Sequence, residues 1–484
     1  MNTPIRRVFL VVMVMALALM VSATAIQYFR AGDLNTDGRN VRALYREYGR
    51  DRGPIIMAGE PVAQSEPVDD AYSFLRTYPR GSLMAPVTGY FSLVNGVTGM
   101  ERAENSVLNG TSSSLLLERV QALFTGRQPQ GGSVELTIDP AAQQAGFDAF
   151  GDQVGGAVAL DPRTGAVLAL VSTPSFDPNL LTSHDLTAVR TAFDALESDP
   201  EQPLTNRAIA GTLYPPGSTF KLVTMAAALA TGDYHADTVV DAPDQYQLPG
   251  SSALLGNPGG ERCGDGVSVT LEYALQVSCN TPFAMLGVEL GDDALREQAE
   301  AFGWGQELEI PLTVTPSIFP EDPDAAQTAM SAIGQFDVRA TPLQMAMVSA
   351  AIGNGGVLMK PYLTATTRGP DLNVLSVAEP SVLSTAMTEG NAAELRDMMV
   401  NVVENGTGFR AQIPGVAVAG KTGTAQTAPG RPPHAWFTAF APADDPQVAV
   451  AVAVEYGGDL EGAATGSKVA APIARAIMEA VLQQ

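Results

Sequence analysis

Lysine is rare in this chain, and two of its lysines stand near hydroxyl side chains at spacings that could do chemistry. The four lysines are Lys221, Lys360, Lys421 and Lys468. Ser218 precedes Lys221 by one helical turn, within Pro-Pro-Gly-Ser-Thr-Phe-Lys, so a helix would place hydroxyl and amine on one face. A serine hydroxyl is a poor nucleophile until a base removes its proton, and a desolvated lysine can be neutral enough to do so. The pair therefore indicates covalent catalysis.

A simpler interpretation is that Ser218 caps a helix and Lys221 is a surface charge, which is common for an isolated match. The residues after Lys221, Leu-Val-Thr-Met-Ala-Ala-Ala-Leu-Ala, argue against it. A helix that is apolar on nearly every side is buried, and a buried amine needs a partner or a purpose. We therefore expect Ser218 to be a nucleophile and Lys221 to be its base.

Two further motifs follow along the chain. Ser278-Cys-Asn280 is weak by itself, because serine and asparagine commonly end helices and Pro282 marks a break. In the run 419–426, Ala-Gly-Lys-Thr-Gly-Thr-Ala-Gln, small residues around Lys421 would let a substrate backbone lie beside a strand. In isolation this run could equally be a glycine-rich turn at the start of a strand. The Ser278 motif gains weight only from its position between the other two.

The segments around these motifs predict one antiparallel sheet with helices packed on it. Strand-like patterns occur at residues 134–138, 156–161, 165–171, 435–441 and 447–455. Ile473, Ile477 and Val481 then mark one face of a terminal helix. Hairpins at both ends of a domain, enclosing a helical middle, build one sheet from opposite ends of that domain. The predicted fold class of this part is therefore α+β.

At 484 residues the chain is too long for one hydrophobic core, so at least two domains are expected. Residues 39–52 have the spacing of an amphipathic helix. Residues 53–132 break into short segments such as 87–94, which predicts a small strand-rich domain without catalytic motifs. Residues 125–132 lack periodicity and are rich in turn formers, so we expect the domain boundary there. The predicted division is 1–27 for an N-terminal anchor, 28–132 for a non-catalytic domain and 133–484 for the catalytic domain.

The N-terminus predicts a single membrane anchor. Arg6 and Arg7 precede an uncharged run, residues 8–26, which as a helix is long enough to span the hydrocarbon core of a bilayer. Because the positive charges precede the run, we expect the N-terminus in the cytoplasm and the rest of the chain outside it. The alternative is a cleaved signal peptide, since Ala23-Thr-Ala25 fits a cleavage site. The run is longer than the core of a usual signal peptide, which favours the anchor.

The composition argues against several classes of function. Lys+Arg 28 against Asp+Glu 52 gives a formal net charge of −24, and so acidic a surface repels phosphate backbones. We therefore expect no nucleic-acid binding. Two cysteines and three scattered histidines cannot supply a zinc site of the usual ligands and spacings. No metal and no cofactor is expected.

The two cysteines of the chain, Cys263 and Cys279, allow one disulfide. Under the predicted orientation both lie in the exported, oxidising compartment, where paired cysteines usually become disulfides. Cys263 lies in a glycine-rich loop that can bend toward a partner, and Cys279 stands between Ser278 and Asn280. A bridge would therefore fasten the second motif. The alternative is that both thiols are reduced and act as small, buried apolar side chains.

Taken together, the three motifs resemble those of penicillin-binding protein transpeptidase domains, a branch of the penicillin-recognising serine acyltransferases. The resemblance runs from about Val134 to the C-terminus and includes further segments at residues 136–139, 159–166, 174–179, 334–335, 340–346 and 434–437. It implies the penicillin-recognising serine transferase fold. The N-terminal part resembles the monofunctional class B members, in which an anchor and a non-catalytic pedestal domain precede the transpeptidase. Among these the chain is most similar to the actinobacterial A-type cell-division transpeptidases.

The resemblance implies roles for the first two motifs in peptidoglycan cross-linking. Ser218 would attack the carbonyl between the two terminal D-alanines of a stem peptide, and Lys221 would accept its proton. Ser278 would relay a proton to the leaving D-alanine, and Asn280 would hold the amide of the stem. An amine from a second stem would then resolve the acyl-enzyme. β-Lactams would acylate the same serine.

The resemblance implies that the third motif binds the substrate. The terminal carboxylate of the stem would face Lys421, Thr422 and Thr424, and Gly423 would permit close approach of the substrate. The charge of Lys421 would also favour the neutral form of the base nearby. The backbone N–H groups of Ser218 and Thr424 would form the oxyanion hole.

Several other activities compete with transpeptidation. A class A β-lactamase needs a glutamate to activate the deacylating water, and no convincing Glu-x-x-x-Asn segment lies between Asn280 and Lys421. The motifs do not exclude a D,D-carboxypeptidase. A catalytically silent scaffold or a β-lactam sensor is the alternative from a different class, although intact Ser218 and Lys221 weigh against silence. The partners we expect are stem peptides, β-lactams, a membrane glycan polymerase reached through the anchor and pedestal, and division proteins.

Overall fold

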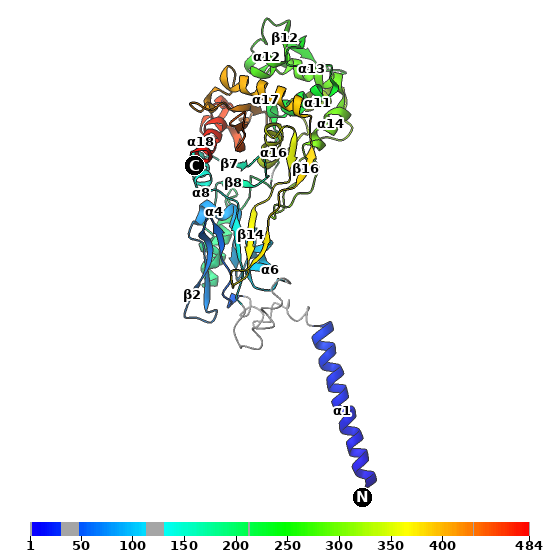
Figure 1. Cartoon of the computed structure of the whole chain (residues 1–484), viewed down its shortest axis with the longest axis vertical. Helices are drawn as coiled ribbons and strands as arrows, with labels where there is room; N and C mark the ends of the chain where they lie inside the picture. The colour runs from blue at the N-terminus through cyan, green and yellow to red at the C-terminus, as the bar shows by residue number, and fades with distance from the viewer. Residues whose placement is uncertain (1, 31–47, 113–129, 212, 429, 484) are drawn as a thin grey trace.

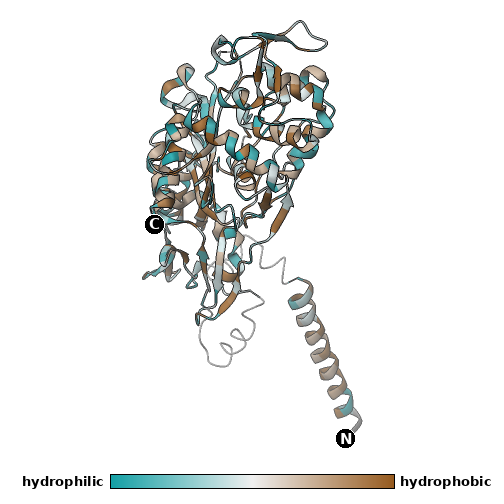
Figure 2. Cartoon of the chain, turned by 45° about the horizontal axis from the view of Figure 1, so that its top comes forward, coloured by the Kyte–Doolittle hydropathy of each residue, from teal (hydrophilic) through white to brown (hydrophobic). Residues whose placement is uncertain are grey.

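The computed structural model describes residues 2–30, 48–112, 130–211, 213–428 and 430–483. Helix α1 (Asn2–Phe29) stands apart from the rest of the described chain and is hydrophobic along most of its length (Figures 1 and 2). It is the one helix among the described residues that is long and apolar enough to cross a membrane, and none of it is buried. The predicted amphipathic helix at 39–52 and the predicted boundary at 125–132 fall largely outside the described residues.

The pedestal domain rests on a six-stranded sheet that also takes strands from the catalytic part. The strand order is β15-β14-β6-β1-β2-β3. Their bounds are β1 (Ile55–Met57), β2 (Glu60–Pro67), β3 (Phe74–Thr77), β6 (Ser133–Leu136), β14 (Thr364–Arg368) and β15 (Val374–Val377). The strand predicted at 134–138 thus pairs with β1 of the pedestal, parallel to it, and with β14 on its other side. The β14 segment runs down from the catalytic part to reach it (Figure 1). Strands from both sides of the predicted boundary therefore share one sheet.

The pedestal contains more helix than the sequence predicts. Its remaining elements are α4 (Gly81–Thr88), α5 (Gly99–Ala103), α6 (Asn105–Leu108) and the short hairpin β4 (Phe91–Ser92) with β5 (Gly96–Val97). Of the predicted segment 87–94, only Phe91 and Ser92 form a strand, because Val87 and Thr88 end helix α4. Leu83, Met84, Val87 and Thr88 are buried, which is the spacing of one helix face. This buried face is recognised only in the folded structure, where the helix packs against the sheet and its neighbours.

A buried ion cluster holds the pedestal together. Glu101 of α5 lies between two arginines, accepting from Arg52 Nε over 2.5 Å and from Arg76 Nε over 2.6 Å. All three side chains are at most 2% exposed. Arg52 also donates to Asn105 Oδ1, and Tyr78 donates its hydroxyl to Glu101. Each charge in this cluster therefore has an opposite charge in direct contact.

The catalytic domain is built on a five-stranded antiparallel sheet, as the sequence predicts. The order is β17-β18-β19-β7-β8, so strands from opposite ends of the domain meet where β19 pairs with β7. The bounds are β7 (Gly155–Leu160), β8 (Val167–Thr173), β17 (Ala419–Ala425), β18 (His434–Ala441) and β19 (Val448–Val454). Strand β17, which carries the third motif, lies at one edge.

Both faces of this sheet are covered by helices. The sequence of β19 suits its position in the middle of the sheet. Its residues alternate valine and alanine, and all are buried. The valines pack in the cluster with α8 (Pro140–Phe150) and the predicted terminal helix α18 (Ala470–Leu482), whereas the alanines pack in the cluster with α16 (Pro342–Gly353). Small side chains on one face let α16 pack close to the sheet. Figure 1 shows the sheet between these layers.

Helices beyond the sheet complete the domain and carry the first two motifs. They are α11 (Lys221–Thr231), α12 (Leu271–Gln276), α13 (Thr281–Leu290), α14 (Asp292–Ala301), α15 (Ala325–Ser331) and α17 (Glu389–Glu404). Helices α9 (Asn179–Thr182) and α10 (Leu186–Ser198) and the hairpin strands β9 (Val239–Asp241), β12 (Ser268–Thr270), β10 (Gln245–Gln247), β11 (Leu254–Gly256), β13 (Val357–Met359) and β16 (Val382–Thr385) lie around them. Helix α17 packs against β17, α11 and α12 and so joins the three elements that carry the motifs.

Candidate active site

Ser218 lies in the 3-10 turn η2 (Gly217–Phe220), directly before helix α11. Gly217 has a φ of 53°, and its N–H donates to Gly334 O over 2.9 Å. A Cβ at Gly334 would lie 2.1 Å from Gly217 O, so only glycine allows this approach. The turn also packs against β17. These contacts fix the backbone of Ser218 beside the third motif.

Lys221 begins helix α11 and is completely buried. Its Nζ donates to Ser278 O and to Asn280 Oδ1, each over 2.9 Å, and lies 3.5 Å from Ser278 Oγ. Burial, and next the charge of Lys421, lowers the pKa of Lys221 well below its usual 10.5. A neutral amine has two N–H groups for the two short hydrogen bonds and keeps a lone pair that can accept a proton.

Ser278 lies between the two lysines. It occupies the loop between α12 and α13 with a φ of 65°, a left-handed conformation that few residues other than glycine adopt. Its Oγ accepts from Lys421 Nζ over 2.7 Å and lies 3.5 Å from Lys221 Nζ. The hydroxyl can therefore exchange a proton with either amine, which suits a relay.

Lys421 of β17 is also completely buried, and its amine points to the second motif. Besides Ser278, its Nζ donates to Thr422 O over 2.9 Å. Burial lowers the pKa of Lys421 to about 7. Its charge lies close enough to lower the pKa of Lys221, as the sequence interpretation expected.

Asn280 is oriented by a loop that the sequence did not single out. Asn257 Oδ1 accepts from the N–H groups of Asn280 and Thr281 over 2.8 and 3.1 Å. The Nδ2 of Asn280 donates to Gly256 O over 3.0 Å, and its Oδ1 accepts from a lysine. An amide nitrogen carries two hydrogens, so one remains for a substrate carbonyl. No motif in the sequence marks Asn257.

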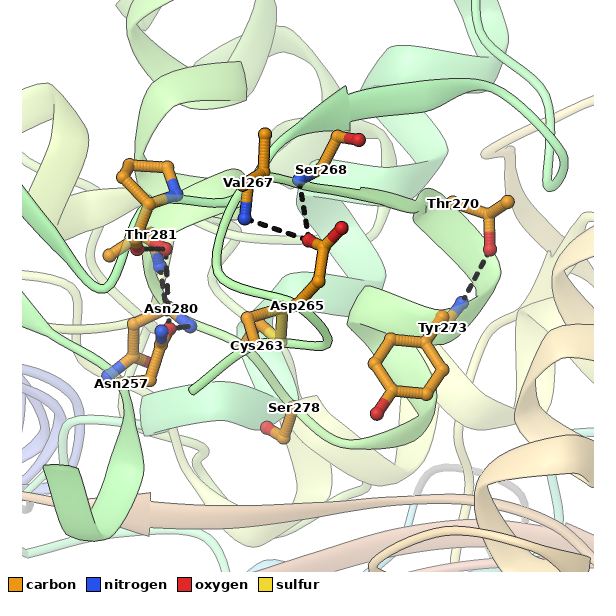
Figure 3. The surroundings of a disulfide bond; sticks show 12 residues. Asn257, Cys263, Asp265, Val267, Ser268, Thr270, Tyr273, Ser278, Asn280 and Thr281 are labelled. Atoms are coloured by element: carbon orange, nitrogen blue, oxygen red, sulfur yellow. Dashed lines mark hydrogen bonds between the residues drawn. A yellow bond between two sulfur atoms is a disulfide. The ribbon is translucent and has the colours of Figure 1, made fainter. Parts of the chain in front are cut away.

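The two cysteines are bonded to each other in the structure. Cys263 and Cys279 form a disulfide across 16 residues, and both are buried. Figure 3 shows the bridge beside Ser278 and Asn280, joining the loop before strand β12 to the second motif. The motif is therefore tied to its neighbouring loop both covalently and through Asn257.

The third motif lies on β17, an edge strand of the sheet that is buried at every position but one. Gly423 faces η2, where a Cβ would lie 3.0 Å from Pro216 O, and Thr424 is exposed. Thr422 is mostly buried, and its Oγ1 lies 2.7 Å from Thr407 Oγ1. Sequence reasoning missed Thr407, although the Asn-Gly-Thr turn that contains it is a recognisable signal. The structure thus brings together all three motifs and adds two residues to them.

The comparisons with known proteins agree with this geometry. The penicillin binding protein transpeptidase domain family matches residues 155–479, and the penicillin binding protein A dimerisation domain family matches residues 52–134. The chain therefore belongs to the penicillin-binding protein transpeptidase family. The predicted fold, a penicillin-recognising transferase domain with an N-terminal pedestal, is confirmed.

Several individual relatives match this chain over most of its length. The chain is 48% identical to the peptidoglycan D,D-transpeptidase PbpA of Mycolicibacterium smegmatis, and the match covers 100% of both chains. It is 47% identical to the PbpA of Mycobacterium tuberculosis over 100% of this chain and 99% of that one. The ceftriaxone acyl-enzyme of penicillin-binding protein A from M. tuberculosis superposes with a TM-score of 0.88 at 47% identity, covering 91% of this chain and 100% of that chain.

Proposed function

We propose that this protein is a peptidoglycan D,D-transpeptidase that cross-links stem peptides through an acyl-enzyme on Ser218. The observation that carries the proposal is the pair of buried lysines around Ser278, beside a serine in a turn that packs against strand β17. The relatives named for this activity match over their full length. Acyl-enzyme complexes of a relative at 46–47% identity support β-lactam binding through an acyl-enzyme.

The first step is attack by Ser218. Neutral Lys221 takes the proton of the hydroxyl while Oγ bonds to the carbonyl carbon between the terminal D-alanines. The oxyanion that forms is stabilised by the N–H groups of Ser218 and Thr424, each worth a few kcal/mol. Collapse of this intermediate breaks the C–N bond, and the leaving D-alanine takes a proton from the Ser278 hydroxyl, which Lys221 replenishes. The acyl group stays on Ser218.

The second step resolves the acyl-enzyme. The amine of a neighbouring stem attacks the ester carbonyl and loses its proton through the same relay. The ester C–O bond then breaks, Ser218 Oγ takes back a proton from Lys221, and the new amide bond is the cross-link. The remaining N–H of Asn280 supports the donor stem at its amide carbonyl. The hydroxyl groups of Thr422 and Thr424, with the charge of Lys421 behind them, support the terminal carboxylate of the donor.

The placement in the cell follows from the anchor. The apolar helix α1 supports attachment to a membrane, and the arginines before its apolar run favour a cytoplasmic N-terminus with the catalytic domain outside. We propose residues 28–132 as pedestal and 133–484 as transpeptidase domain. Partners at the anchor and pedestal would be a membrane glycan polymerase and division proteins.

One experiment tests the catalytic assignment. Purified protein is exposed to penicillin and mapped by mass spectrometry, and we expect the adduct on the peptide that contains Ser218. Ser218→Ala is expected to lose labelling while it still melts cooperatively. Turnover of a thioester stem mimic with an amine acceptor then separates a transpeptidase from a sensor, which only acylates, and from a carboxypeptidase, which only hydrolyses. An adduct elsewhere would overturn the assignment.

A further inference from the structure

The turn after helix α17 touches both walls of the active site. Thr407 Oγ1 lies 2.7 Å from Thr422 Oγ1 of the third motif. The N–H of Thr407 donates to Gln276 O over 3.2 Å, and Gln276 Nε2 donates back to Asn405 O over 2.9 Å. Gln276 ends helix α12, two residues before the serine of the second motif. One turn therefore spans the two motifs.

The turn depends on a glycine at its centre. A Cβ at Gly406 would lie 2.3 Å from Gln276 O and 2.9 Å from Val402 O, so any side chain there would push the turn away from α12. The Asn405-Gly-Thr407 sequence is thus explained by close packing on α12. It leaves Thr407, which is half-buried, as the hydroxyl that faces the third motif.

The two hydroxyl groups share one hydrogen bond, and the charge of the bound substrate decides which of them donates it. Each hydroxyl has one proton, and only one of the two can donate across the 2.7 Å contact. If Thr422 donated to Thr407, it would turn lone pairs toward the substrate carboxylate and repel it. If Thr407 donates to Thr422, the proton of Thr422 is free for the carboxylate, and the bond to an anion is shorter and stronger than a neutral one.

We propose that Thr407 is a positioning residue for the terminal carboxylate of the donor stem. It donates to Thr422 Oγ1 and so orients the Thr422 proton toward that carboxylate. This inference rests on the proposed role of Thr422 in carboxylate binding. The ligand class that Thr407 selects is a peptide or lactam with a free carboxylate beside the reacting carbonyl, in preference to the corresponding neutral amide.

The test compares two thioester stem mimics that differ only at the terminus, one a carboxylate and the other a carboxamide. Thr407→Val keeps the shape of the side chain and removes its hydroxyl. We expect kcat/KM for the carboxylate mimic to fall about tenfold, mainly through KM, and kcat/KM for the carboxamide mimic to change less than about twofold. Thr407→Ser, which restores the hydroxyl, is expected to recover the preference for the carboxylate.

Controls separate this role from a merely structural one. Thr191 on helix α10 is exposed, and Thr191→Val makes the same change of side chain away from the site. Thermal melting checks that each variant is folded, and Thr407→Ala replaces Thr407→Val if the valine prevents folding. An equal loss with both mimics, or no loss with either, would overturn the proposal for Thr407.

Thr422→Val in the same assay keeps the two proposals distinguishable. If it lowers the carboxylate preference while the Thr407 variants do not, carboxylate binding by Thr422 stands and the role of Thr407 is wrong. If neither threonine affects the preference, the assignment of Thr422 is wrong as well. Penicillin labelling of Ser218 is independent of both outcomes.

Discussion

The pedestal buries a pair of arginines and the active site buries a pair of lysines, but the two pairs are partnered differently. In the pedestal, Glu101 contacts both Arg52 and Arg76. In the catalytic domain, the amine of Lys221 contacts neutral oxygens, and the nearest charge that acts on it is that of Lys421. Burial next to an opposite charge keeps a cation charged, whereas burial beside neutral groups and a like charge favours the neutral amine.

The difference separates a structural use of buried charge from a chemical one. Arginine stays protonated in proteins, so the pedestal cluster can only orient and hold its elements. Lysine loses its proton readily when it is desolvated, so the active-site pair can take up and release protons. Burying the two lysines lowers the stability of the folded state. In exchange, the site gains amines that can take up and release protons, a trade-off that is common at active sites.

The largest expected effect is the loss of chemistry without loss of fold at Lys221. Lys221→Met keeps the length of the side chain but removes the base, so the second-order rate of penicillin acylation should fall by about 10²–10⁴-fold. The melting temperature should hold or rise, because a desolvated amine is gone. Lys360→Met, at an exposed position, is the matched control. Acylation at the normal rate in Lys221→Met would remove this lysine from the mechanism.

At Glu101 we expect a loss of stability without a loss of chemistry. Glu101→Gln removes the charge that partners two buried arginines, and breaking a buried pair in this way costs about 3–5 kcal/mol. Urea unfolding should therefore show a lower midpoint. The acylation rate per folded molecule should be unchanged, because the pedestal holds none of the motif residues. Exposed Glu60, which pairs with Arg80 at the surface, offers Glu60→Gln as control. A change in acylation with normal stability would contradict the division between the two regions.

The disulfide should contribute a smaller amount, in the catalytic domain alone. A bridge that closes a roughly 15-residue loop stabilises by about 3 kcal/mol in the chain-entropy model. Cys263→Ser with Cys279→Ser should therefore lower stability and slow acylation, since the cross-link next to Ser278 is lost. Glutamate-specific cleavage after Glu272 should give two fragments that stay linked without reductant. Full alkylation of both thiols in protein isolated without reductant would refute the bridge.

The smallest expected effect is on the pH dependence of stability, and it tests whether burial neutralises Lys421. The pKa of Lys421 falls from 10.5 to about 7 on folding, so between these values the unfolded chain binds more protons than the native one. Stability should therefore rise with pH across this window, by about 2 kcal/mol from pH 7 to 9 for this group. Lys421→Met should reduce the rise by that amount, as measured by urea unfolding at both values. An identical rise in the variant would show that burial does not neutralise Lys421.

Much of the catalytic domain could be predicted because its signals are local. Short apolar runs bounded by turns mark the strands β7, β8, β18 and β19, and the apolar residues after Lys221 mark a buried helix. The order of the three motifs indicates the chemistry, because few side-chain combinations can activate a serine. The pedestal was harder to predict: helix α4 ends where the sequence suggests a strand, since its buried face depends on packing.

The sequence by itself determined which residues we propose as nucleophile and base and which elements carry them, because each is encoded within a few neighbouring residues. Only the tertiary structure decided how distant segments complete the site. Asn257 and Thr407 contact the motifs across loops, and β14 crosses from the catalytic part to pair with β6 near the pedestal. Such contacts form between residues that are far apart in the sequence. A single hydroxyl or amide produces no periodic pattern, so the sequence does not indicate its partner.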